Sequence, residues 1–173
     1  MGMLVYNICF IRRGDHVLLM NRNKAAWMGR WNGIGGKLLP GESPRASVLR
    51  EVLEETGIRL TDASYKGMVT WSEGNGRKGG MYLYTATLDD DYPYPTPVRA
   101  DEGLLDWKRL DWIVHPDNEG VASNIPSFLP LLLEDEQCYE HECLFEEKRF
   151  VSLVSRPIPK ESELSLAPMA ELA

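Results

Sequence analysis

The alternation of apolar and polar residues predicts most of the secondary structure of this 173-residue chain. Residues 4–11 (LVYNICFI) and 16–22 (HVLLMNR) are strand-like runs separated by the turn sequence RRGD, which together predict a β-hairpin. Residues 64–71 and 81–88 are two further strand-like runs, joined by the polar, glycine-rich segment SEGNGRKGG. The first half of the chain is therefore expected to contribute at least four strands.

The second half of the chain continues this pattern with more interruptions. Residues 104–113 predict a strand that runs into a short turn of helix, and residues 142–155 predict a final pair of strands. The segment 89–103 between these regions is too rich in proline for a central strand. Strands alternate with predicted helices, which favours an α/β fold with a mixed β-sheet and helices on its faces.

Two segments have the apolar spacing of helices. For the helix predicted at 44–56, Ser43 is a good N-cap, Pro44 suits the first turn, and Gly57 is the expected left-handed residue at the end. The second helix is predicted at 125–136 (IPSFLPLLLEDE). It contains Pro130, which must lie in an early turn or produce a kink.

Composition limits the classes of function. The net charge is −7 and no basic stripe is visible, so a broad nucleic-acid-binding surface is not expected. A phosphate-bearing substrate would need a bound cation or a few placed Arg and Lys residues. The chain has no apolar run of about 18 residues and no signal-peptide pattern, so we expect a cytoplasmic protein without a membrane span. Residues 1–156 are expected to form one domain and residues 157–173, rich in Pro, Glu, Ser and Ala, a loosely held tail.

The sequence LREVLEETG places Glu51, Glu54 and Glu55 on the first predicted helix. At about 100° per residue the three carboxylates share one face. Like charges at this spacing repel by roughly 0.2–0.5 kcal/mol per pair. The opposite face, expected to be buried, carries Ala46, Leu49, Val52, Leu53 and Thr56.

Two interpretations of this acidic face are open. A solvated face would normally carry lysines for pairing at i and i+4, yet the only basic residues between Glu42 and Thr56 are Arg45 and Arg50. The second interpretation is a site for a hard divalent cation, since Mg²⁺ and Mn²⁺ take oxygen ligands and neutralise clustered carboxylates.

The spacing of the surrounding residues favours the cation site. The stretch GGKLLPGESPRASVLREVLEETGI satisfies the pattern G-x5-E-x7-R-E-U-x-E-E-x-G-U, where U is apolar. The fixed positions are Gly36, Glu42, Arg50, Glu51, Val52, Glu54, Glu55, Gly57 and Ile58. The chain therefore resembles the Nudix family. This resemblance implies an α/β/α sandwich with a loop–helix–loop catalytic motif and hydrolysis of substrates in which a nucleoside diphosphate is linked to another group.

The resemblance also implies roles for individual residues. The carboxylates of Glu51, Glu54 and Glu55 and the backbone carbonyl of Gly36 would bind Mg²⁺, for which Mn²⁺ can substitute. Arg50 would orient Glu51, while Glu42 and Gly57 would have structural roles in the motif. Glu102 lies in the sequence RADEGLLDW, where many family members place a further acidic residue near the metal; the alternative is an exposed loop acid. Either Glu51 or Glu102 could be the general base that accepts a proton from water.

The segment GRWNGIGGK at 29–37 resembles the MutT-like branch, whose members hydrolyse oxidised purine nucleoside triphosphates. In that branch the residue matching Asn32 contacts the base, although a loop Asn also commonly stabilises a turn. Candidate substrate-binding residues are Asn32, Trp27 and Trp31 (stacking on a base, or ordinary packing), Lys37 (phosphate contact, or a surface ion pair) and Asn124. Asn124 stands where the branch has an acidic residue, which leaves the base specificity open.

The resulting functional prediction is Mg²⁺-dependent hydrolysis of a nucleoside triphosphate, such as 8-oxo-dGTP, to a nucleoside monophosphate and pyrophosphate. The partner is then a small-molecule nucleotide, and the protein could be a monomer or a homodimer. The alternatives are another nucleoside diphosphate derivative (a nucleotide sugar, a dinucleotide or an RNA 5′ end) and a nucleotide-binding module without activity.

Overall fold

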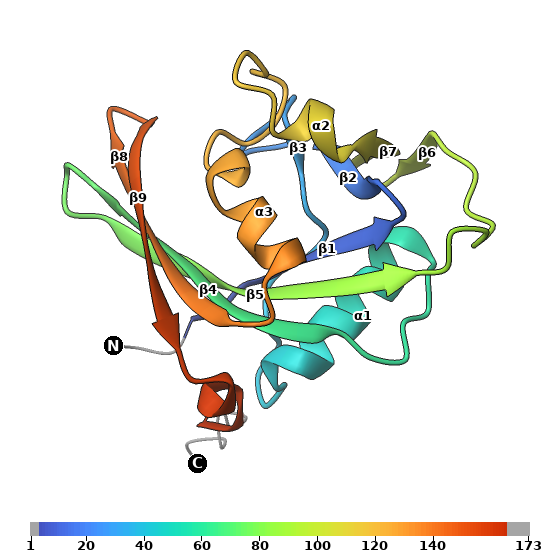
Figure 1. The fold of residues 1–173 in the computed structure, drawn as a ribbon, viewed down its shortest axis with the longest axis horizontal. Coiled ribbons are helices and arrows are strands. Elements are labelled where there is room, and N and C mark those ends of the chain that lie inside the picture. The colour runs from blue at the N-terminus through green and yellow to red at the C-terminus, as the bar shows by residue number, and fades with distance from the viewer. Residues whose placement is uncertain (1–3, 166–173) are drawn as a thin grey trace.

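The computed structural model describes residues 4–165, which form one mixed nine-stranded sheet with helices on both faces (Figure 1). The strands are β1 (Asn7–Arg13), β2 (His16–Arg22), β3 (Trp31–Asn32), β4 (Ser64–Glu73), β5 (Lys78–Leu88), β6 (Val98–Ala100), β7 (Gly103–Arg109), β8 (Cys138–Glu146) and β9 (Arg149–Ile158). The helices are α1 (Pro44–Thr56), α2 (Leu110–Ile113), α3 (Ile125–Glu134) and the 3₁₀ helix η1 (Lys160–Ser165).

The sheet has the strand order β6-β7-β2-β1-β5-β4-β8-β9, and β3 pairs with β2 off this path. β1 pairs with β5 and β4 with β8 in parallel, while the other pairings are antiparallel. The predicted α/β class with a mixed sheet is confirmed, as is the β1–β2 hairpin. The proline-rich segment supplies only the three-residue β6, at one edge of the sheet. None of the helices within residues 4–165 has the length and apolar character needed to cross a membrane.

Helix α1 begins and ends at the predicted residues. The Ser43 side chain accepts a hydrogen bond from the Ala46 N–H at 3.2 Å, and Pro44 occupies the first helical position. Gly57 has a φ of 76°, and its N–H donates to the Leu53 carbonyl. A side chain at this position would be strained, which explains why glycine ends the helix.

The buried face of α1 differs from the predicted one. Ser47, Val48, Val52 and Thr56 are buried, whereas Ala46 is exposed. The helix therefore packs on the sheet through residues four positions apart. Its neighbouring stripe, from Ser47 to Glu51 and Glu55, faces the glycine-rich loop instead of solvent. The acidic face is consequently enclosed on one side, which a helical projection of the sequence alone could not show.

Two hydrophobic clusters lie on opposite faces of the sheet. One surrounds α3 and includes Phe10, Phe128 and Leu129, and the other lies under α1 and includes Ile11, Val48 and Val52. In Figure 1, α1 and α3 are seen on these two sides of the sheet. Pro130 is the sixth residue of α3, so it lies inside the helix, past the first turn.

The C-terminal part of the structure corrects the prediction of a loose tail from residue 157. β9 runs to Ile158, and η1 follows. The Glu163 carboxylate accepts hydrogen bonds from Arg45 (2.7 and 3.0 Å) and from the Tyr84 hydroxyl (3.1 Å). These contacts attach η1 to the start of α1 and to the sheet. Residues 166–173 of the predicted tail lie outside the described residues.

We expect Glu163→Gln to destabilise the fold by about 1–2 kcal/mol, because it removes the charge from a carboxylate that accepts two hydrogen bonds from Arg45. Equilibrium urea unfolding measures this difference. Glu161→Gln, an exposed neighbour on η1, is the matched control and should change stability by less than about 0.5 kcal/mol. Equal changes in the free energy of unfolding for the two substitutions would show that the contacts of Glu163 contribute nothing to stability.

His141 gives the fold a pH dependence. The side chain is fully buried, its Nδ1 lies 2.8 Å from the Ser155 hydroxyl, and burial lowers the pKa of the imidazole from 6.5 to about 4. The unfolded chain binds this proton at a higher pH than the native protein does. The free energy of unfolding should therefore fall as the pH drops from about 6.5 to about 4, by up to about 1.4 kcal/mol per pH unit from this group.

The variant His141→Phe keeps an aromatic ring at this position and cannot titrate. Urea unfolding between pH 4 and 7.5 should show a shallower pH dependence for this variant than for the wild type. His16→Gln, at a more exposed histidine, is the control. Parallel curves for wild type and His141→Phe would contradict the assignment.

Candidate active site

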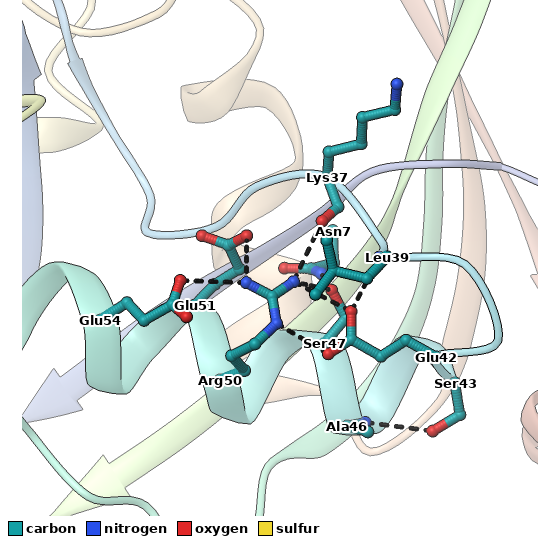
Figure 2. Close-up of polar contacts among 10 residues, drawn as sticks. All are labelled: Asn7, Lys37, Leu39, Glu42, Ser43, Ala46, Ser47, Arg50, Glu51 and Glu54. Atoms are coloured by element: carbon teal, nitrogen blue, oxygen red, sulfur yellow. Dashed lines mark hydrogen bonds and ion pairs between the residues drawn. The ribbon is translucent and has the colours of Figure 1, made fainter.

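The Arg50 guanidinium lies at the centre of the motif and contacts three carboxylates (Figure 2). It donates to Glu42 at 2.8 and 2.9 Å, to Glu51 at 2.8 Å and to Glu54 at 3.0 Å. Nη2 also donates to the Lys37 carbonyl at 3.1 Å. The hydrogen bond with Glu42 is the largest cause of a raised pKa of Arg50, so this side chain stays charged. One cation thus fixes the relative positions of the loop and of the acidic face of α1.

Glu42 closes the loop onto the helix. Its carboxylate accepts hydrogen bonds from Arg50 and from the backbone N–H of Leu39 at 2.9 Å. The hydrogen bond from Arg50 is the largest cause of a lowered pKa of Glu42. These contacts are those that the predicted tethering role requires.

Gly36 and Gly35 bring the loop backbone against the glutamates. A Cβ atom at Gly36 would lie 2.5–2.6 Å from the carboxylate atoms of Glu51, so only glycine leaves room for that group. The Gly35 backbone forms a hydrogen bond with the carboxylate of Glu55. The loop and the helix are therefore in direct contact at the residues that the motif fixes.

A cavity of about 450 Å³ opens between the second half of α1 and residues 98–102. Glu51, Glu54, Glu55 and Glu102 all line it. Burial, followed by the charges of Glu102 and Glu51, raises the pKa of Glu55 to about 8. Burial and the neighbouring carboxylates therefore both oppose ionisation of Glu55 in this cavity.

The turn that carries Glu102 is attached to the segment after β2. Lys24 Nζ lies 2.5 Å from Glu102 Oε1, and this hydrogen bond is the largest cause of a lowered pKa of Glu102. The Asn23 N–H donates to the Glu102 carbonyl and its side chain to the Asp101 carbonyl, both at 3.0 Å. Glu102 is thus a residue of the acidic cavity rather than an isolated loop acid. Sequence reasoning did not find Asn23 and Lys24, because only the β2–β7 pairing brings segments 78 residues apart together.

The donor set is suited to a divalent cation. Carboxylates and a backbone carbonyl are the ligands that Mg²⁺ and Mn²⁺ prefer. Within residues 4–165, however, no three His, Cys, Asp or Glu side chains are arranged as a ready cation site. Arg50 and Lys24 instead hold oxygens of Glu51, Glu54 and Glu102. The metal ligands therefore stay predictions, and binding would require these side chains to turn toward the ion.

Three of the predicted base-binding residues, Trp27, Trp31 and Asn124, lie on the other face of the sheet, toward α3. Trp27 packs on Phe145 with ring centroids 6.2 Å apart, and Asn124 Nδ2 lies 3.9 Å from the Cys143 sulfur. Both contacts are with β8. Trp31 pairs with Val121, three residues before Asn124.

The other two substrate candidates have mainly local contacts. Asn32 Oδ1 accepts a hydrogen bond from the Gly33 N–H at 2.9 Å, which is the turn-stabilising alternative for this residue. The Lys37 side chain is exposed and points away from the Arg50 cluster (Figure 2). The Trp31 ring is covered by Lys108, whose Nζ lies 4.2 Å from the ring centroid. The structure thus places Trp27, Trp31 and Asn124 on the α3 side, whereas Asn32 pairs with Met20 of the cluster under α1 and the Lys37 side chain is exposed.

Several carboxylates on a loop–helix–loop, beside a cavity, form a donor set of the kind that suits divalent cations. The family model for the NUDIX domain matches residues 3–130. The chain belongs to the Nudix family, and within it is a MutT-like Nudix pyrophosphohydrolase.

Comparison with individual proteins agrees with this family. The chain is 27% identical over 138 residues to the oxidized purine nucleoside triphosphate hydrolase of Mus musculus, covering 79% of this chain and 84% of that protein. It is also 30% identical over 155 residues to the isopentenyl-diphosphate Delta-isomerase of Corynebacterium diphtheriae, covering 79% of this chain and 76% of that protein. The fold resembles the mutator MutT protein of Bacillus halodurans with a TM-score of 0.72 at 23% identity, covering 89% and 98%.

The contact between Gly36 and Glu51 generates a prediction. Gly36→Ala should displace the flexible Glu51 carboxylate, because the added Cβ would lie within 2.6 Å of it. Stability should change by less than about 1 kcal/mol, whereas Mn²⁺ affinity should fall about tenfold or more. Isothermal titration with Mn²⁺ and urea unfolding measure the two effects.

Gly74→Ala is the matched control, because a Cβ atom there meets nothing within 4 Å. It should leave Mn²⁺ affinity unchanged. Wild-type affinity in Gly36→Ala would show that the position of Glu51 against Gly36 is not needed for metal binding.

Proposed function

We propose that this chain hydrolyses a purine nucleoside triphosphate with an oxidised base to a nucleoside monophosphate and pyrophosphate, with Mg²⁺ as cofactor. The observation that carries the proposal is the set of four carboxylates, Glu51, Glu54, Glu55 and Glu102, around one cavity. The bound cation would supply charge neutralisation at the phosphoryl oxygens and a lowered pKa of the attacking water.

The residues of the chain have separate tasks in this proposal. Glu51, oriented by Arg50 at 2.8 Å, accepts the proton of the attacking water, with Glu102 as the second candidate for the base. The water oxygen forms a bond to phosphorus as the bond to the leaving pyrophosphate breaks. Glu54, Glu55 and the Gly36 carbonyl complete the ligand set.

Support for the oxidised purine comes from the other face of the sheet and from the comparisons. Trp27, Trp31 and Asn124 supply aromatic surface and an amide group that can pair with a purine edge, and Asn32, on the same loop as Trp31, is a second amide. The Mus musculus relative is named for an oxidised purine nucleoside triphosphate. Asn124 in place of an acidic residue favours a base specificity broader than that of the branch.

The decisive experiment is a product panel analysed by chromatography, with Mg²⁺, with Mn²⁺ and with EDTA. The substrates are 8-oxo-dGTP, dGTP, 2-oxo-dATP, ADP-ribose, a nucleotide sugar, a dinucleoside polyphosphate, a triphosphorylated RNA and isopentenyl diphosphate. We expect the highest kcat/KM with an oxidised purine triphosphate and no turnover in EDTA. Preference for another phosphoanhydride, or isomerisation of isopentenyl diphosphate, would overturn the substrate assignment.

On the preferred substrate, Glu51→Gln should lower kcat by about 10²–10⁴-fold, because the amide cannot accept the proton of water. The free energy of unfolding should change little, since the amide oxygen can still accept a hydrogen bond from Arg50. Glu136→Gln, an exposed position after α3, is the matched control. Near-normal turnover by Glu51→Gln would refute its catalytic role.

A further inference from the structure

Two buried polar residues, Asn7 and Ser47, lie between β1 and α1 and are not assigned a role above. Asn7 is 2% exposed and Ser47 is fully buried. Asn7 Nδ2 donates a hydrogen bond to Ser47 Oγ at 2.7 Å (Figure 2). They belong to the few buried polar residues of the described chain. The cluster around them under α1 is apolar.

The hydrogen bonds continue from Ser47 into the catalytic motif. Ser47 Oγ accepts a weak hydrogen bond from Arg50 Nη2 at 3.4 Å, and its hydroxyl bonds with the Glu42 carboxylate. Ser47 therefore connects Asn7 to Arg50 and Glu42, and Arg50 is the side chain that donates a hydrogen bond to Glu51. Figure 2 shows Asn7 and Ser47 behind the Arg50 guanidinium, on the side toward β1.

The backbone of Asn7 is attached to the glycine-rich loop. Its N–H donates to the Gly36 carbonyl at 3.0 Å. A Cβ atom at Gly35 would lie 2.2 Å from the Asn7 carbonyl oxygen, so the two backbones are in close contact. Asn7 is thus bonded by its main chain to the loop and by its side chain to the helix.

Asn7 is an unfavourable choice if only stability is at stake. Its Oδ1 is buried and finds no hydrogen-bond partner among the described residues. Burial of an unpaired amide oxygen is costly, and an apolar residue of the same size would avoid that cost. An amide at this position is explained if its hydrogen bond to Ser47 is needed for the geometry of the site.

We propose that Asn7, acting through Ser47, is a positioning residue that sets the distance between the Gly36 carbonyl and the Glu51 carboxylate, the two metal ligands predicted on separate segments. The inference rests on the proposed function, because it concerns the same cation site. Side chains that hold metal ligands in place typically contribute 10- to 100-fold to metal affinity or activity.

The test compares Asn7→Leu and Ser47→Ala with a matched control. Ser155→Ala removes a partly buried side-chain hydrogen bond of similar length, 2.8 Å to His141, in the β8–β9 hairpin. Mn²⁺ affinity is measured by isothermal titration and stability by urea unfolding. The kinetic constants kcat and KM are measured with the preferred nucleotide. We expect Asn7→Leu and Ser47→Ala to weaken Mn²⁺ binding about tenfold and to lower kcat, with KM little changed. Ser155→Ala should alter stability alone.

Further outcomes separate this inference from its alternatives. If both variants fold and bind Mn²⁺ like the wild type, the positioning role is wrong, whatever they do to stability. Ser47→Ala keeps a good helix former in α1, so it decides the matter should Asn7→Leu fail to fold. In the double variant, the loss of affinity should not exceed that of Ser47→Ala alone, since Asn7 is proposed to act only through Ser47; a further loss would contradict the proposal.

The proposed function can fail separately. A wild-type protein that binds Mn²⁺ and cleaves no nucleotide refutes the proposed function, while the Mn²⁺ affinities of the variants still decide the positioning role. A wild-type protein that binds no Mn²⁺ overturns both.

Discussion

The ion pairs of the Arg50 guanidinium are the constraint on which the site depends. Glu42 on the loop and Glu51 and Glu54 on α1 are close like charges, and their mutual repulsion would oppose the contact between loop and helix if no cation offset it. Arg50 donates to Glu42 on the loop side and to Glu51 and Glu54 on the helix side, so one side chain joins the two halves of the motif. The guanidinium suits this position because its planar fork contacts several carboxylates at once and remains charged.

Part of this arrangement could be predicted from sequence because it is local. Ser43, Pro44 and Gly57 fix the ends of α1 through contacts within a few residues, and both ends were correct. The predicted strand segments were also correct, since the alternation of apolar and polar residues is a property of adjacent residues in the chain. The buried face of α1 was predicted correctly at Val52 and Thr56 and wrongly at Ala46, and the burial of Ser47 was missed because Ser47 lies on the stripe with Glu51 and Glu55 that faces the glycine-rich loop. Only the tertiary structure reveals the position of that loop.

The remaining features depend on contacts between distant segments. Lys24 and Glu102 are brought together by the β2–β7 pairing, and Glu163 reaches Arg45 because η1 follows the edge strand β9. The composition of residues 157–173 suggested a loose tail, yet residues up to 165 form a strand end and a 3₁₀ helix held by a carboxylate. The contacts of Glu163 with Arg45 and Tyr84 attach this segment to the rest of the fold. Such long-range contacts cannot be read from the composition of the segment.

In the proposed function, the two faces of the sheet would have different roles. Carboxylates gather on the α1 side, where Lys24 and Arg50 hold them in place, whereas Trp27, Trp31 and Asn124 lie on the α3 side. The loop from Trp31 to Gly36 connects them, because Trp31 pairs with the segment before α3 while Gly36 lies against Glu51. A nucleotide with its base on one side and its phosphates on the other would follow this loop. Substitutions at its two ends should therefore act on different properties, base preference at one and metal-dependent turnover at the other.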